Sequence, residues 1–132
     1  MPAVNWFAVL AATLSMFVLG ALWYSPLLFV KPWIKAAGLE MDVEKRGNFV
    51  VILGTSFVLT LIMATNLAFF VAGVTDLVAV IGYSVAAGLG WAALGLWVIS
   101  LFERRPFTYV LINGGYLTVG FAIMGLILGL WR

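Results

Sequence analysis

Residues 77–102 read LVAVIGYSVAAGLGWAALGLWVISLF, a long run without one charged side chain. About 20 apolar residues are enough for a helix to cross the hydrocarbon core of a bilayer. Three more runs of this kind occupy residues 4–30, 47–73 and 107–131. The runs are continuous rather than alternating, which favours helices over the strands of a barrel. The sequence therefore predicts an all-α polytopic membrane protein, with residues 1–132 forming a single bundle of four transmembrane helices.

The composition agrees with lipid as the solvent. Of the 132 residues, 65% are hydrophobic and 9% are charged. Soluble domains average about 45–50% hydrophobic and about 25% charged residues. The chain contains no Cys and no His, so disulfides, thiolate chemistry and imidazole ligands are excluded. We predict no metal site and no cofactor.

The basic residues indicate how the chain is threaded through the membrane. Six of them lie in the first and third connections: Lys31, Lys35, Lys45, Arg46, Arg104 and Arg105. The second connection, residues 74–76, has none, and Arg132 is the lone exception to the pattern. By the positive-inside rule, the two basic connections are cytoplasmic and both termini lie on the outer side of a bacterial inner membrane. We expect the six residues to contact lipid headgroups and not nucleic acid.

The cytoplasmic segment 31–46 is the one sizeable polar stretch. Ser25-Pro26 should end or kink the first helix. Apolar residues then recur at helical spacing up to Ala37, which predicts a short interfacial helix ending at Gly38; a plain loop is the alternative. Two acidic residues are candidate N-caps, Asp42 for the second span and Asp76 for the third.

Small residues recur every four positions and predict where helices approach closely. On the third span they are Gly82, Ala86 and Gly90, with a second row through Gly88; the fourth span has Gly125 and Gly129. One interpretation is packing within a single bundle. The other is that a stripe, on the fourth or second span, also forms a homodimer.

The intramembrane polar residues are uncharged and fall into two groups by depth. Asn66 and Tyr83 belong to the outer group, and Tyr24, Ser25, Asn113 and Tyr116 to the inner one. Thr55, Leu59, Ile62 and Asn66 share one face of the second span. Amides are costly against lipid, so these faces should point inward. They form interhelical hydrogen bonds or line a small cavity or headgroup site, and Trp91 flanks an apolar ligand or fills space.

Several strings resemble a bacterial family of small four-span membrane proteins of unknown function, the DUF1761 type. They are NWFAV (5–9), GALWYSPL (20–27), LFERRP (101–106), LINGGY (111–116) and MGLILGLW (124–131). The resemblance implies a four-helix membrane protein and supplies no substrate or partner. It also implies that Trp23, Tyr24, Pro26, Asn113 and Tyr116 recur in the family.

Three functions remain to be weighed. The first is a structural or accessory protein that packs with itself, with membrane lipids or with a larger membrane complex. The second is an oligomeric transporter or channel for an uncharged or lipophilic small molecule. The third, a lipid-modifying enzyme, is disfavoured because no base stands beside a nucleophile, and we predict no catalytic residues.

Overall fold

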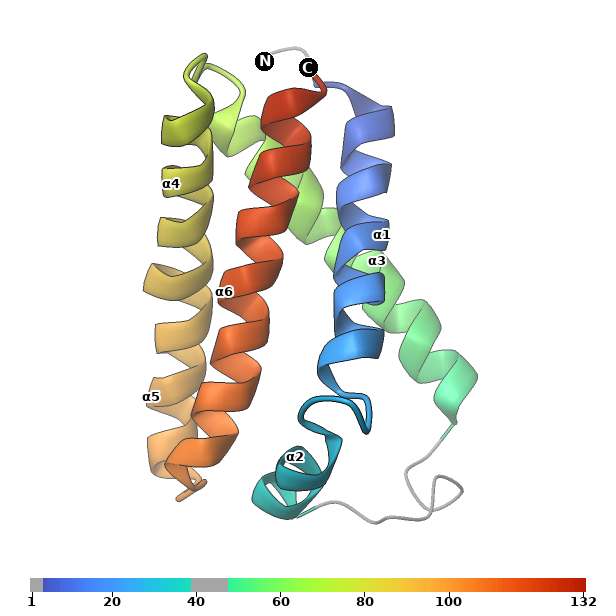
Figure 1. The fold of residues 1–132 in the computed structure, drawn as a ribbon, viewed down its shortest axis with the longest axis vertical. Coiled ribbons are helices and arrows are strands. Elements are labelled where there is room, and N and C mark those ends of the chain that lie inside the picture. The colour runs from blue at the N-terminus through green and yellow to red at the C-terminus, as the bar shows by residue number, and fades with distance from the viewer. Residues whose placement is uncertain (1–3, 39–47) are drawn as a thin grey trace.

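The computed structural model describes residues 4–38 and 48–132, which form helices joined by short turns (Figure 1). The predicted all-α class is confirmed. In chain order the elements are α1 (Trp6–Trp23), α2 (Val30–Ala37), α3 (Phe49–Val71), α4 (Leu77–Ala87), the π-helical segment η2 (Gly88–Ala93), α5 (Leu94–Phe102) and α6 (Phe107–Leu130). Because α4, η2 and α5 follow one another without a break, they make one rod. Within the described ranges, four helices are long and apolar enough to cross a membrane: α1, α3, the rod and α6.

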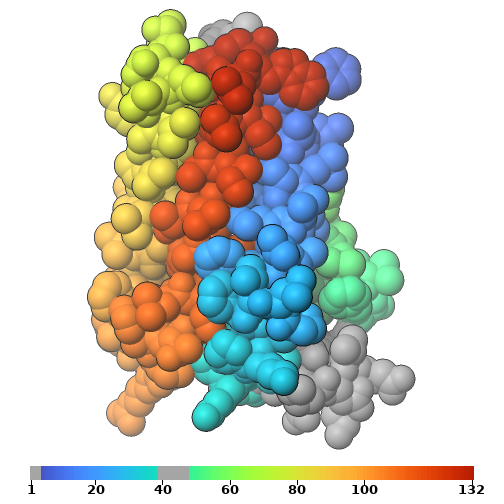
Figure 2. All heavy atoms as spheres, in the orientation of Figure 1, coloured from blue at the N-terminus to red at the C-terminus, as the bar shows by residue number. Residues whose placement is uncertain are grey.

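Helix α6 lies between α1 and the α4–α5 rod, and α3 crosses obliquely behind them (Figure 1). Side chains fill the space between these helices (Figure 2). The start of α1 and the end of α6 lie at one end of the bundle, and α2 lies at the other. The core is formed by side chains from four elements, among them Val9, Met16, Val71, Val80 and Met124.

Helix α1 is shorter than the predicted span 4–30. The Asn5 side chain caps its start by accepting hydrogen bonds from the backbone N–H groups of Phe7 and Ala8. The helix ends at Trp23 because the residue before a proline, here Ser25, is disfavoured in helical conformation. The chain then turns back, and the Phe29 N–H donates to the Trp23 carbonyl at 3.1 Å.

The ends of α2, α3 and α4 each have a local cause. Gly38 closes α2 with a φ of +67°, as predicted, because glycine adopts this left-handed conformation without strain. Asn48 caps α3 through Val50 and Val51. The predicted cap Asp42 lies outside the described residues, as do Lys45 and Arg46. Asp76 caps α4 by accepting from the Ala79 N–H at 3.1 Å, as predicted.

The π-helical segment changes which residues of the third span face α6. A π turn holds one more residue than an α turn, so it rotates everything that follows it. Ala87 and Gly88 are buried where the segment begins, with Gly88 against Phe121 of α6, and Ala93 and Ser100 are buried after the extra residue. Trp91, within the segment, is 70% exposed. The segment therefore lets both halves of the rod bury small residues while the indole stays outside.

Candidate functional surfaces

The inner polar group meets at a seam between α1 and α6, which we call the α1–α6 seam and define by Trp23, Tyr24, Asn113 and Tyr116. The Tyr24 hydroxyl donates to Asn113 Oδ1 at 2.5 Å. The Tyr116 hydroxyl donates to the Met16 carbonyl at 3.0 Å, and Trp23 Nε1 donates to the Ile112 carbonyl at 2.8 Å. Three donors thus link the two helices.

Aromatic packing tightens the same seam. The Tyr24 ring lies 4.8 Å from the Trp33 ring of α2 and 5.4 Å from the Tyr116 ring, measured between centroids. Ser25, predicted in this group, instead donates to the nearby Leu22 carbonyl at 2.6 Å. The seam joins helices, and its two tyrosine hydroxyls and its indole N–H are already engaged in hydrogen bonds between them.

The predicted small-residue rows divide into packed and open positions. A Cβ at Gly88 would lie 2.6 Å from Phe121, one at Gly129 would lie 2.7 Å from Leu77, and one at Gly125 would overlap Ser84. These three glycines let α6 and the α4–α5 rod approach closely. By contrast, Gly82 and Gly90 have no atom within 4 Å of such a Cβ, and Ala86 is exposed. The row through Gly82 therefore packs against nothing within the described chain.

One polar face points the opposite way from the prediction. Thr55, Leu59, Ile62 and Asn66 are all exposed, and we call this row the outward face of α3. The prediction that it points inward is wrong, because α3 packs on the bundle through a different row. That row consists of Ala64, Leu67, Ala68 and Val71.

A lateral crevice lies beside this face, between α3 and η2. It encloses about 270 Å³ and is lined by Met63, Asn66, Leu67, Phe70, Ala87, Trp91 and Phe121. The Phe70 ring lies 6.2 Å from the Tyr83 ring and 5.7 Å from the Trp91 ring. The outer polar residues Asn66 and Tyr83 are thus gathered at one surface with Trp91. Within the described chain, the Asn66 amide forms no hydrogen bond.

The basic residues at the α2 end differ in their contacts. Arg105 Nη1 donates to the Ala37 carbonyl at 2.8 Å, and its guanidinium lies 5.5 Å from the centre of the Tyr109 ring. This bond ties the end of α2 to the α5–α6 turn. Lys31, Lys35 and Arg104 are exposed, and Arg104 has a φ of 57°, which is strained for a residue other than glycine.

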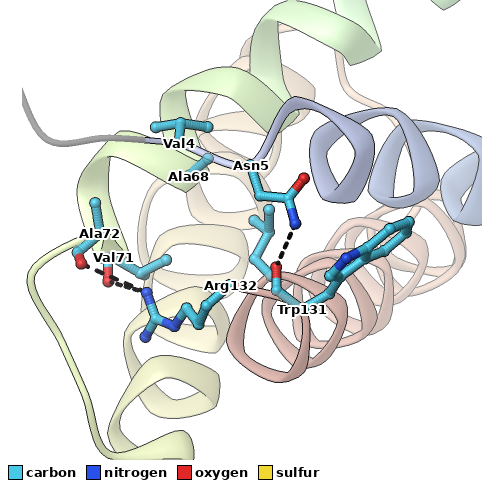
Figure 3. A pocket seen from close by; sticks show the side chains of 8 residues that line it. Val4, Asn5, Ala68, Val71, Ala72, Trp131 and Arg132 are labelled. Atoms are coloured by element: carbon cyan, nitrogen blue, oxygen red, sulfur yellow. Dashed lines mark hydrogen bonds between the residues drawn. The ribbon is translucent and has the colours of Figure 1, made fainter.

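Arg132 has a structural role that sequence reasoning missed. Its guanidinium donates to the carbonyls of Val71 and Ala72 at the end of α3 (Figure 3), and to the carbonyl of Val74 just beyond it. The last carbonyls of a helix lack partners within it and carry negative charge, so a cation there is favourable. Beside it, Asn5 Nδ2 donates to the Trp131 carbonyl at 3.4 Å, and the residues enclose a hollow of about 200 Å³.

Four apolar helices, packed through glycines and internal hydrogen bonds, define the chain as a polytopic helical membrane protein. The family described as protein of unknown function (DUF1761) matches residues 7–129. The chain belongs to this family, which confirms the resemblance found in the sequence. No curated protein and no solved structure matches the chain.

Proposed function

We propose that this chain is a small accessory protein of the bacterial cytoplasmic membrane that associates side by side with other membrane helices, first of all those of a second copy. The outward face of α3 is the observation that carries the proposal. It presents Asn66 and Thr55 on the exposed side of a membrane-spanning helix. An unpaired amide against hydrocarbon is unfavourable, so a neighbour that offers a hydrogen bond is favoured.

A second copy satisfies this requirement by symmetry. A side-chain amide both donates and accepts hydrogen bonds, so the Asn66 side chains of two copies can pair with each other. A twofold interface brings the same patch of each protomer together. Leu59 and Ile62 on the same face are exposed and apolar, and they supply the surrounding contact area.

The remaining polar groups support a role without catalysis. The hydroxyls of Tyr24 and Tyr116 already donate within the α1–α6 seam. Among residues 4–38 and 48–132, no group that would act as a base stands beside either hydroxyl, and an enzyme of this kind needs such a base. We place the α2 end in the cytoplasm and both termini outside, on the strength of Lys31, Lys35 and Arg104 near that end.

Single-cysteine crosslinking in native membranes tests the association. The chain has no cysteine, so each introduced thiol reports on one position. Ile62→Cys should form disulfide-linked dimers on mild oxidation, and adding Asn66→Leu should reduce them. Asn66→Gln, which keeps an amide, should retain most of the crosslinking. Val18→Cys is the matched control, because this residue is 71% exposed but lies on α1.

Two results would overturn the proposal. One is equal crosslinking at positions 18 and 62, which would indicate random collision. The other is a strictly monomeric protein in lipid nanodiscs whose Ile62→Cys variant forms no adduct with itself or with another membrane protein.

A second candidate is passage of an uncharged or lipophilic small molecule through an oligomer. The lateral crevice between α3 and η2 favours it, since its walls are apolar and carry one amide, the usual composition of a small-molecule site. Ala87→Phe, at the crevice wall, should then abolish uptake into proteoliposomes. Uptake equal to that of empty vesicles across a broad panel of such solutes excludes this candidate.

A further inference from the structure

An apolar groove lies at the α2 end, between the start of α6 and the chain that follows α1. It encloses about 360 Å³ and is lined by Trp23, Phe29, Pro32, Thr108, Leu111 and Ile112. In Figure 2 the atoms of the α2 region and of the first turns of α6 lie side by side at this end. The groove is separate from the crevice beside α3 and from the outward face of α3.

The wall of this groove is held in place by contacts already described for the seam. The Trp23 indole is fixed by its hydrogen bond to the Ile112 carbonyl, and its ring packs 4.9 Å from the Phe29 ring. Both rings therefore keep one position without a ligand. A preformed apolar wall reduces the ordering that a bound chain would require.

Basic residues are close in sequence to the residues that line the groove, on both of the chain segments that form it. Lys31 immediately precedes the lining residue Pro32, and Arg104 lies in the turn that leads to Thr108. Both side chains are exposed. Arg105, next along the chain, is tied to Ala37 and keeps the two sides together. Among the described residues, Glu103 is the acidic side chain at this end, so the local charge is positive.

We propose that this groove binds one anionic phospholipid, with an acyl chain against Trp23 and Leu111 and the phosphate near Lys31 and Arg104. The inference rests on the proposed function only in taking the chain to lie in a membrane. Charge complementarity selects the headgroup, because basic pockets between helices attract anionic lipids. Thr108, an exposed residue that lines the groove, adds a hydroxyl donor.

Native mass spectrometry of the protein reconstituted from vesicles of equimolar phosphatidylglycerol and phosphatidylethanolamine tests the site. One phosphatidylglycerol should be retained per chain. Lys31→Gln and Arg104→Gln should each weaken retention by about fivefold, the effect of removing one basic residue near an anionic surface. Leu111→Trp, which fills the groove and leaves every charge in place, should abolish it; Leu111 is 58% exposed, so the bundle accommodates the larger ring.

Lys35→Gln is the matched control, because it removes the same charge one helical turn beyond Lys31. A specific site predicts a smaller effect at position 35 than at position 31. Equal losses at 31, 35 and 104 together with normal retention in Leu111→Trp would overturn the proposal, since general surface charge would then explain the binding. Displacement of the lipid by inorganic phosphate alone would also overturn it.

The outcome is separable from that of the proposed association. Crosslinking of Ile62→Cys should be the same with and without Leu111→Trp, since the groove and the outward face of α3 are formed by different residues. Loss of lipid retention with crosslinking intact isolates the groove. Loss of crosslinking with lipid retention intact contradicts the proposed association and still supports the lipid site.

Discussion

Helices α6 and α3 have similar composition but use their polar and small residues in opposite ways. Both are long and apolar, and both carry one asparagine; α6 has five glycines and α3 has one, Gly54. In α6, Asn113 accepts a hydrogen bond from α1, and Gly125 lies against Ser84. In α3, Asn66 is exposed, and Gly54 has no atom within 4 Å of an added Cβ. The difference separates a helix that organises the bundle from one that offers a face to its surroundings.

The largest effect in this comparison should come from the glycines. Gly125→Ala should lower the free energy of unfolding by about 1–3 kcal/mol, because the new methyl overlaps Ser84 and forces α6 away from α4. Gly54→Ala should be neutral or raise it by up to about 1 kcal/mol, through helix propensity alone. Unfolding in mixed detergent micelles measures both. Equal effects at the two positions would remove the distinction between the helices.

An intermediate effect is expected at the α1–α6 seam. A double-mutant cycle of Tyr24→Phe and Asn113→Ala should give a coupling of about 0.6 to about 1.7 kcal/mol, the range for hydrogen bonds between membrane helices. Tyr83→Phe is the control, since the Tyr83 ring is half exposed and contacts Phe70 through its edge. A coupling indistinguishable from zero would mean that the hydroxyl and the amide do not interact.

The smallest effect should come from the exposed amide. Asn66→Leu should change the stability of the monomer by less than about 0.5 kcal/mol, because the side chain makes no contact that folding requires. Asn113→Leu should destabilise it more, since it also leaves the Tyr24 hydroxyl without its acceptor. The two variants can be compared by thermal unfolding at a low ratio of protein to detergent, where the protein is monomeric. A larger loss from Asn66→Leu would show that the α3 row faces the bundle.

Much of the fold could be predicted because membrane crossing leaves strong local signals. The absence of charge over 77–102 indicated the third span, and Asp76 and Gly38 marked helix ends through side-chain and backbone chemistry. Asn48 was missed as the cap of α3, although an asparagine directly before an apolar run is a recognisable signal. Ser25-Pro26 indicated the end of α1, but the predicted span still extended too far.

The direction of the polar face of α3 could not be predicted, whereas Asn113 and Tyr116 of α6 do point toward α1. In water, polarity itself tells which side of a helix faces out; in lipid, both the interior and the surroundings are apolar. The spacing of Thr55 and Asn66 therefore gave a shared face but not its orientation. The π-helical segment could not be predicted from the sequence either. It depends on contacts between residues far apart in the chain, such as Gly114 of α6 against Ala93 of the rod.

The unequal lengths of α1 and the α4–α5 rod have a consequence for the lipid around them. With 18 and 26 residues, they measure about 27 Å and about 39 Å at 1.5 Å per residue. A typical bilayer core is about 30 Å thick and adapts to mismatch by thinning, thickening or tilting its helices. Acyl chains beside α1 therefore meet a shorter wall than those beside the rod. We therefore expect the bilayer to be thinner beside α1 than beside the rod, wherever tilt of the longer helix does not absorb the difference.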